Sequence, residues 1–169
     1  MRRKALLPLL ATLLFLAVSA PALGDDGLKF AAELTGAEEV PPVQTATTGK
    51  VEVEFNADAT AADFELEVFD GVAVTQAHLH CGAAGQNGPV VVFLFGFIPG
   101  GFDVDGQIAE FTLTDANVAA VGADCLPVIG REINTLADLL DAARDGLIYA
   151  NVHTVANPGG EVRGQLAED

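Results

Sequence analysis

Strict alternation of apolar and polar residues in short segments is the feature that most constrains the fold of this chain. In residues 49–55, Val51, Val53 and Phe55 alternate with charged residues, and residues 64–68 repeat the pattern. Successive side chains of a strand point to opposite faces, so this alternation is typical of strands with one buried and one solvated face. The intervening Asn-Ala-Asp-Ala-Thr is typical of a turn, and the two segments are predicted to form a hairpin.

Further segments have strand character, and one segment has helix character. Strands are predicted over residues 28–34, 74–80, 90–95, 107–113, 147–154 and 161–166. Residues 90–95 are continuously apolar, which predicts burial on both faces, whereas the Gly- and Pro-rich residues 97–106 predict an irregular connection. Thr135 and Asp138 have the spacing of a capping box, and Gly146 is a typical helix-ending residue, so residues 135–146 are predicted to be helical.

About eight short strands and one helix, without alternation of strands and helices, predict the fold class. The class is all-β, a Greek-key β-sandwich with one short helix before the penultimate strand.

The first 24 residues have the organisation of a secretory signal peptide. A basic start at residues 1–4 precedes an apolar run, and the small residues Ala22 and Gly24 precede the expected cleavage site. Residues 5–18 are fewer than the roughly 20 apolar residues that a membrane span needs. We therefore predict cleavage after Gly24, which leaves residues 25–169 as one domain without a membrane span. An uncleaved anchor is the alternative.

Charge and cysteine content limit the partners and indicate the compartment. Residues 25–169 hold 5 basic and 24 acidic side chains, a formal charge of −19, which argues against nucleic acid and anionic membranes as partners. The acids alternate along strands and do not cluster as in a calcium loop, so they indicate a solvated acidic surface. Two cysteines in an exported chain predict one disulfide, Cys81–Cys125. A thiolate ligand at Cys81 is disfavoured, because Cys81 leaves the strand on the face opposite His80.

All three histidines lie in two strand-like segments. His78 and His80 are two residues apart, so both rings leave the same face of a strand, and His153 lies in the middle of another. If these strands are neighbours, three imidazoles converge and can bind one copper or zinc ion. The alternative is a structural role, in which the histidines, Asn151 and Thr154 hydrogen-bond the backbone of the Gly-rich loop at residues 82–89. Imidazoles within about 4–5 Å of one another, with open nitrogens, would favour the metal.

Glu161 and Arg163 share a strand face and could form an ion pair. Surface pairs of this kind are worth about 0–1 kcal/mol, and a structural role is expected. The sequence has no Ser-His-Asp signature, P-loop or dinucleotide fingerprint, so an enzyme is not the favoured prediction.

Five ordered motifs from about Leu28 to Leu166 resemble a chordin-type (CHRD) domain. They lie at residues 34–43, 77–82, 87–90, 149–154 and 157–166. The resemblance implies a free-standing, single-domain, exported member of that family with an immunoglobulin-like or superoxide-dismutase-like sandwich, secreted or periplasmic. Asn151, Thr154, Glu161 and Arg163 fall in the motifs as supporting residues.

Two further comparisons limit the activity that this resemblance implies. In animal chordins such domains belong to an extracellular antagonist of bone morphogenetic proteins, but the cysteine-rich modules that help bind the growth factor are absent from this sequence. The His-x-His pair also resembles the copper strand of copper/zinc superoxide dismutases. Those enzymes use more histidines and a zinc-ligand aspartate, so dismutase activity is not predicted.

Two functions follow as predictions. The first is a non-enzymatic extracytoplasmic binding or structural module, whose partner is an unknown extracytoplasmic protein or cell-surface ligand. The second is a transition-metal (copper or zinc) binding or redox protein that uses His78, His80 and His153.

Overall fold

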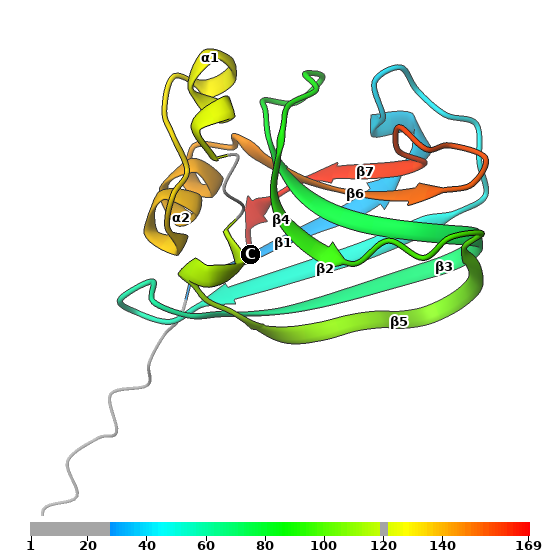
Figure 1. Ribbon diagram of the computed structural model, residues 1–169, viewed down its shortest axis with the longest axis horizontal. Coiled ribbons are helices and arrows are strands. Elements are labelled where there is room, and N and C mark those ends of the chain that lie inside the picture. Colours follow the sequence, from blue (N-terminus) through cyan, green and yellow to red (C-terminus); the bar gives the residue numbers. More distant parts are fainter. Residues whose placement is uncertain (1–27, 119–121) are drawn as a thin grey trace, which may run out of the picture.

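The computed structural model describes residues 28–118 and 122–169 (Figure 1). The predicted signal peptide and its cleavage site after Gly24 lie outside these residues. The strands of the described part are β1 (Leu28–Thr35), β2 (Thr48–Phe55), β3 (Ala62–Cys81), β4 (Val90–Phe95), β5 (Phe102–Leu113), β6 (Ile148–Thr154), β7 (Val162–Gln165) and β8 (Ala167–Glu168). The helices are α1 (Leu126–Ile129) and α2 (Leu136–Arg144), with short 3-10 turns η1 (Gly36–Glu38), η2 (Asp115–Asn117) and η3 (Gly122–Cys125).

The strands form an antiparallel sheet that closes on itself through β3. Its order is β2-β1-β7-β6-β3-β4, with β5 beside β3 and β8 beside β1. The first part of β3 pairs with β2, and the part from Val74 to Cys81 pairs with β6. β3 therefore connects β2, at one end of this order, with β6 near the other end, and the sheet closes. The all-β prediction is confirmed. The predicted Greek-key sandwich is not, because a single strand of 20 residues connects regions that a sandwich divides between two sheets.

The continuity of β3 corrects the sequence prediction of separate strands at 64–68 and 74–80. Asp70 and Ala73 both have a φ of 51°, and the pairing with β5 shifts register between Val68 and Gly71 and again between Gly71 and Val74. These are β-bulges, which bend a strand without ending it. The Asp-Gly pair therefore marks a bend, and β5 follows the bent strand from Phe102, inside the segment expected to be irregular.

β4 also differs from its prediction. Phe93 is 56% exposed, so this strand is not buried on both faces. In the described part, β4 pairs with β3 and is bridged at Val92 by Val118, which leaves the outer side of Phe93 uncovered.

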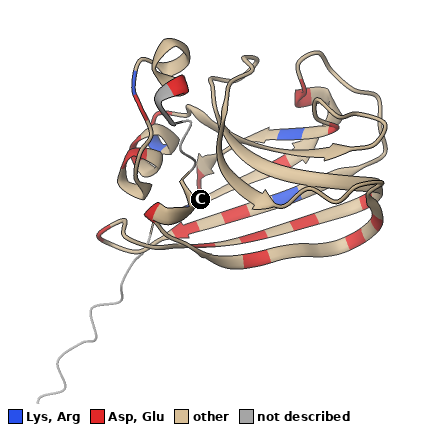
Figure 2. Cartoon of the chain, in the orientation of Figure 1, with Lys and Arg blue, Asp and Glu red and all other residues tan. Residues whose placement is uncertain are grey.

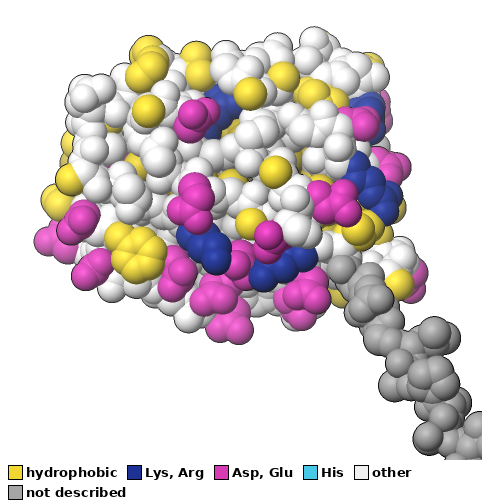
Figure 3. All heavy atoms as spheres, turned by 180° about the vertical axis from the view of Figure 1, so that it is seen from behind, with side chains coloured by type: hydrophobic (Ala, Val, Ile, Leu, Met, Phe, Trp, Pro, Cys, Tyr) yellow, Lys and Arg dark blue, Asp and Glu magenta, His cyan; other side chains and the backbone are white. Residues whose placement is uncertain are grey.

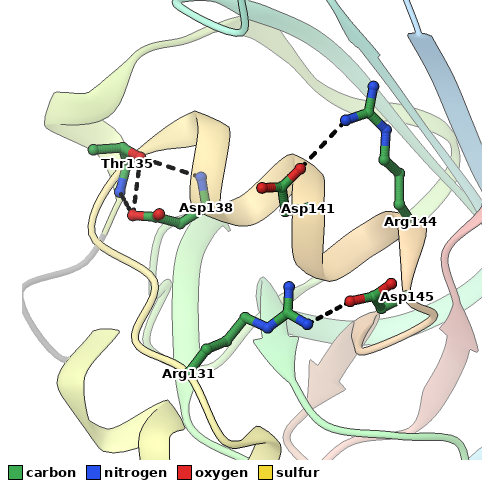
Figure 4. Close-up of polar contacts among 6 residues, drawn as sticks. All are labelled: Arg131, Thr135, Asp138, Asp141, Arg144 and Asp145. Carbon is green, nitrogen blue, oxygen red and sulfur yellow. Dashed lines mark hydrogen bonds and ion pairs between the residues drawn. The ribbon is translucent and has the colours of Figure 1, made fainter.

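Local signals predicted the helix α2 correctly. The backbone N–H of Asp138 donates to Thr135 Oγ1 at 3.1 Å, and the N–H of Thr135 donates to Asp138 Oδ2 at 3.0 Å (Figure 4). Leu136, Leu139 and Leu140 are buried, and the helix lies at one end of the closed sheet (Figure 1). No helix in residues 28–118 and 122–169 is long and apolar enough to cross a membrane.

The polar faces of β2, the first half of β3 and β5 carry many of the acidic residues (Figure 2). Seen from behind, acidic side chains surround the basic ones on this surface (Figure 3). Lys29 lies 2.7 Å from Glu52, and Lys50 lies 2.5 Å from the same carboxylate. The acids thus form a partly exposed surface, as their alternation along strands predicts.

Candidate metal centre

Two neighbouring antiparallel strands bring the histidines together. In the β3–β6 register, His78 lies opposite Asn151, His80 opposite Tyr149, and Gln76 opposite His153. The alternate residues of both strands, such as Ala77, Leu79, Ala150 and Val152, belong to the apolar core. The three histidines therefore lie on the outer face of the closed sheet, and the condition that their strands be neighbours is met.

The outer face is nevertheless buried, because loops cover it. His78, His80 and His153 are only 3%, 7% and 5% exposed. The loop at residues 82–89 follows β3, the segment from η1 to β2 crosses beside it, and Asn87 Nδ2 donates to the Val40 carbonyl at 2.8 Å. A third loop joins β6 to β7 and lies, like η1, at the end of the sheet away from the helices (Figure 1).

The three imidazoles are close enough to share one ion. Their ligand nitrogens lie within 4.8 Å of one another, and His78 Nδ1 lies 3.0 Å from His153 Nε2. Two nitrogens bound to one tetrahedral zinc at about 2.0–2.1 Å lie about 3.3–3.4 Å apart. A small adjustment therefore separates the hydrogen-bonded pair from a chelating pair.

Backbone carbonyls set the tautomers of two rings. His80 Nδ1 lies 2.9 Å from the Gly88 carbonyl oxygen, and His153 Nδ1 lies 3.0 Å from that of Pro158. A carbonyl only accepts, so both Nδ1 atoms carry the proton and both Nε2 atoms carry a lone pair. Metal-ligating histidines usually have this arrangement, in which the second ring nitrogen donates to a carbonyl or carboxylate.

Two of the buried ring nitrogens are unsatisfied. Among the described residues, neither His78 Nε2 nor His80 Nε2 has a hydrogen-bond partner. Most buried polar atoms in proteins are paired, so each exception requires an explanation, such as an ion or a water molecule.

Burial keeps the imidazoles neutral at pH 7. It lowers the pKa of His78 to about 3, with a further contribution from His153 and His80. It lowers the pKa of His80 to about 4, although the hydrogen bond to Gly88 acts in the opposite direction. The pKa of His153 is lowered by burial as well. The neutral imidazole is the form that binds metals.

Aromatic and cationic side chains hold the cluster from the sides. The Tyr149 ring stacks on His80 with centroids 4.9 Å apart, and the Arg163 guanidinium lies 3.4 Å from the Tyr149 centroid. Phe93 approaches His78 edge-on, with centroids 4.9 Å apart. Arg163 also donates to the Asn87 side chain and to the carbonyls of Ala83 and Gln86 at 2.9–3.2 Å, which fastens the loop at residues 82–89.

The predicted ion pair between Glu161 and Arg163 does not form, because the two side chains fasten different loops. Glu161 accepts from Thr45 at 2.6 Å, Thr47 at 2.8 Å and Asn157 at 3.1 Å, and also from Thr154. Burial acts to raise the pKa of Glu161, but these hydrogen bonds together lower it. Glu161 is therefore a structural carboxylate that ties the 155–161 loop to the segment before β2.

The Cys81–Cys125 disulfide is present in the structure, with Cα atoms 6.0 Å apart. Both cysteines are fully buried, and Cys81 belongs to the apolar core on the face opposite the histidines. The disulfide joins the end of β3 to the helical segment before α2 and leaves Cys81 unable to act as a thiolate ligand.

Sequence reasoning assigned no role to Glu39, although it lies in the first motif. Glu39 follows η1 and is 5% exposed. Burial raises its pKa, while the Arg163 charge and a hydrogen bond from Asn151 lower it. An acidic residue immediately before Val-Pro-Pro carries no local signal of burial, so only the fold reveals that it lies beside Asn151.

Comparison with known proteins identifies one family. The family model described as the CHRD domain matches residues 30–166. Searches of curated proteins and of solved structures gave no match.

Proposed function

The chain belongs to the CHRD domain family, and from this premise we propose that it is an extracytoplasmic, non-enzymatic binding module for one zinc or copper ion. Family membership supports a binding or structural module at a coarse level. The metal, its ligands and the compartment are the specific content of the proposal.

The observation that carries this proposal is the convergence of three buried, neutral imidazoles. Their ligand nitrogens lie within 4.8 Å, and in the described part of the chain His78 Nε2 and His80 Nε2 lack partners. A purely structural role explains the hydrogen bonds of His80 and His153 to backbone carbonyls. It leaves His80 Nε2 without a partner, and an ion shared with the His78–His153 pair satisfies it.

The choice of zinc or copper follows from the ligand type. Imidazole suits both metals, whereas calcium and magnesium prefer oxygen. Carbonyl contacts at His80 and His153 orient the rings for binding through Nε2.

Export is supported by the disulfide and by the predicted signal peptide. Disulfides persist in oxidising compartments, and Cys81–Cys125 closes a long loop in a fully buried position. We therefore expect the protein to act outside the cytoplasm, in a periplasm or after secretion.

Isothermal titration of the untagged protein with Zn(II) and Cu(II) tests the proposal. We expect one equivalent to bind, and we expect the affinity to fall at least about tenfold in a His78→Ala/His80→Ala variant. A Glu54→Gln/Glu65→Gln variant is the matched control, because it removes two charges from the acidic surface and leaves the histidines intact. Equally weak binding by the wild type and the histidine variant would refute a metal function.

A further inference from the structure

We propose that Asn151 Oδ1 is a fourth protein ligand of this ion, and that Glu39 is the positioning residue that aims it. The inference rests on the proposed metal function and adds a specific ligand set. It makes the site a closed centre with three nitrogen donors and one oxygen donor.

Asn151 has the required position in the fold. It lies on β6 between Tyr149 and His153, on the same strand face as both, and opposite His78 in the register with β3. Its side chain is 3% exposed, beneath the same loops that cover the histidines. The strand geometry therefore directs the amide toward the three imidazoles.

The amide oxygen is itself unsatisfied. Asn151 lies beside His80 and acts on its pKa, yet in residues 28–118 and 122–169 neither Asn151 Oδ1 nor His80 Nε2 has a partner in hydrogen-bonding geometry. Because His80 Nδ1 holds the ring proton against Gly88, both atoms present lone pairs. Two buried acceptors side by side are costly, and a shared cation removes the cost for both.

Glu39 decides which end of the amide faces the imidazoles. Asn151 Nδ2 and Glu39 Oε1 both lie against Gly160, so the NH₂ end of the amide is the end on the Glu39 side. The oxygen and nitrogen of a planar amide point in different directions, so Asn151 Oδ1 faces away from Glu39.

Gly160 shows how tightly this pair is held. A Cβ at Gly160 would lie 2.3 Å from Glu39 Oε1 and 2.9 Å from Asn151 Nδ2, and the residue has a φ of 132°. The loop after β6 thus closes directly over the Glu39–Asn151 contact. The amide has little freedom to turn, which favours a fixed ligand.

Cobalt(II) is a suitable probe, because its visible absorption reports ligand type and coordination number. We expect wild-type protein to give the intense bands of a four-coordinate centre. Asn151→Leu should weaken Co(II) and Zn(II) binding at least about tenfold and change the spectrum. Asn151→Asp restores an oxygen donor and should restore the bands, whereas Glu39→Leu should weaken binding without removing a ligand. Gln165→Leu on β7 is the control for general loss of an amide: it removes three hydrogen bonds to backbone carbonyls, so it should lower stability without changing the Co(II) spectrum.

The outcomes separate this inference from the proposed function. Wild-type binding that depends on His78 and His80, with unchanged affinity and spectrum in Asn151→Leu, would overturn the fourth ligand and leave the metal function intact. Absence of any wild-type binding would overturn both. If Asn151→Leu does not fold, Asn151→Ser removes the oxygen from reach without added bulk, and the same loss is expected.

Discussion

Acidification of the metal-free protein should cost stability through the buried histidines. The pKa values of His78 and His80 are about 3 and about 4 in the folded chain, below the 6.5 of an unperturbed imidazole. Below pH 6.5 the unfolded chain therefore binds protons that the folded chain does not. The stabilisation is present above pH 6.5 and is lost as the pH falls from there toward the folded pKa values.

The magnitude follows from the unfolded pKa alone, provided that the rings stay neutral in the folded state. Between pH 7.5 and pH 5, each such histidine costs about 2 kcal/mol, because about 1.5 pH units lie below its unfolded pKa at 1.36 kcal/mol each. His78 and His80 together cost about 4 kcal/mol, a large part of a typical stability of about 5–15 kcal/mol. His153 acts in the same direction, since its pKa is lowered too.

The shifted carboxylates do not add to the loss of stability between pH 6.5 and pH 5. The pKa of Glu161 is lowered, so its stabilisation is lost only as the pH falls below the ordinary carboxyl value near 4.5. The pKa of Glu39 is raised, so its protonation acts in the opposite direction and favours the folded state in acid. The loss between pH 6.5 and pH 5 therefore belongs to the imidazoles.

Urea unfolding followed by circular dichroism at pH 7.5, 6.5 and 5.0, with a chelator present, measures this effect. The free energy of unfolding should fall by about 4 kcal/mol or more in the wild type, and by about 2 kcal/mol less in His78→Gln. A wild-type change below about 1 kcal/mol would show that the histidines are protonated or solvated in the folded chain, and the reasoning would fail.

Two further predictions concern the framework of the site. A Cys81→Ala/Cys125→Ala variant should lose up to about 4 kcal/mol of unfolding free energy, the loop-entropy value for a separation of 44 residues, and reduction of the wild type should give the same loss. Urea unfolding checks both, and metal affinity should persist because the disulfide lies on the opposite face of β3. Arg163→Lys should cost about 2–3 kcal/mol, since lysine cannot reproduce the stacking on Tyr149 and the three contacts to the loop. The exposed Arg144→Lys should change thermal stability by less than about 0.5 kcal/mol, and equal effects of the two variants would contradict a structural role of Arg163.

Local patterns predicted the elements of the fold, and long-range pairing determined its closure. Alternation at 49–55 and the cap at Thr135 are local properties, and both predictions agree with β2 and α2. The closure depends on Asp70 and Ala73, which adopt positive φ although neither is glycine. These residues lie where the pairing with β5 shifts register, so the prediction of separate strands at 64–68 and 74–80 was wrong.

Part of the candidate site could likewise be predicted from local sequence patterns, and part depends on long-range packing. The spacing of His78 and His80 predicted a shared face, because strand geometry has a period of two. The 3.0 Å approach to His153 depends on the register between β3 and β6, across 75 residues of sequence. The position of Glu39 beside Asn151 depends on how the segment after η1 packs against Gly160, and no periodicity encodes such packing.

Loops cover the outer face of the sheet at the candidate site. They explain why the site is buried and why the rule that polar residues of an alternating strand face solvent fails there. In a closed sheet, alternation assigns apolar residues to the core and polar residues to solvent, so His78, Glu161 and Arg163 would be expected to be exposed. They are buried instead, because Arg163 fastens the 82–89 loop and Glu161 fastens the segment before β2. Two polar anchors near the start of β7 thus close the outer face over the imidazoles. It follows that loss of either anchor should expose the histidines and raise their pKa values toward 6.5, which couples the stability of the cover to the protonation state of the metal ligands.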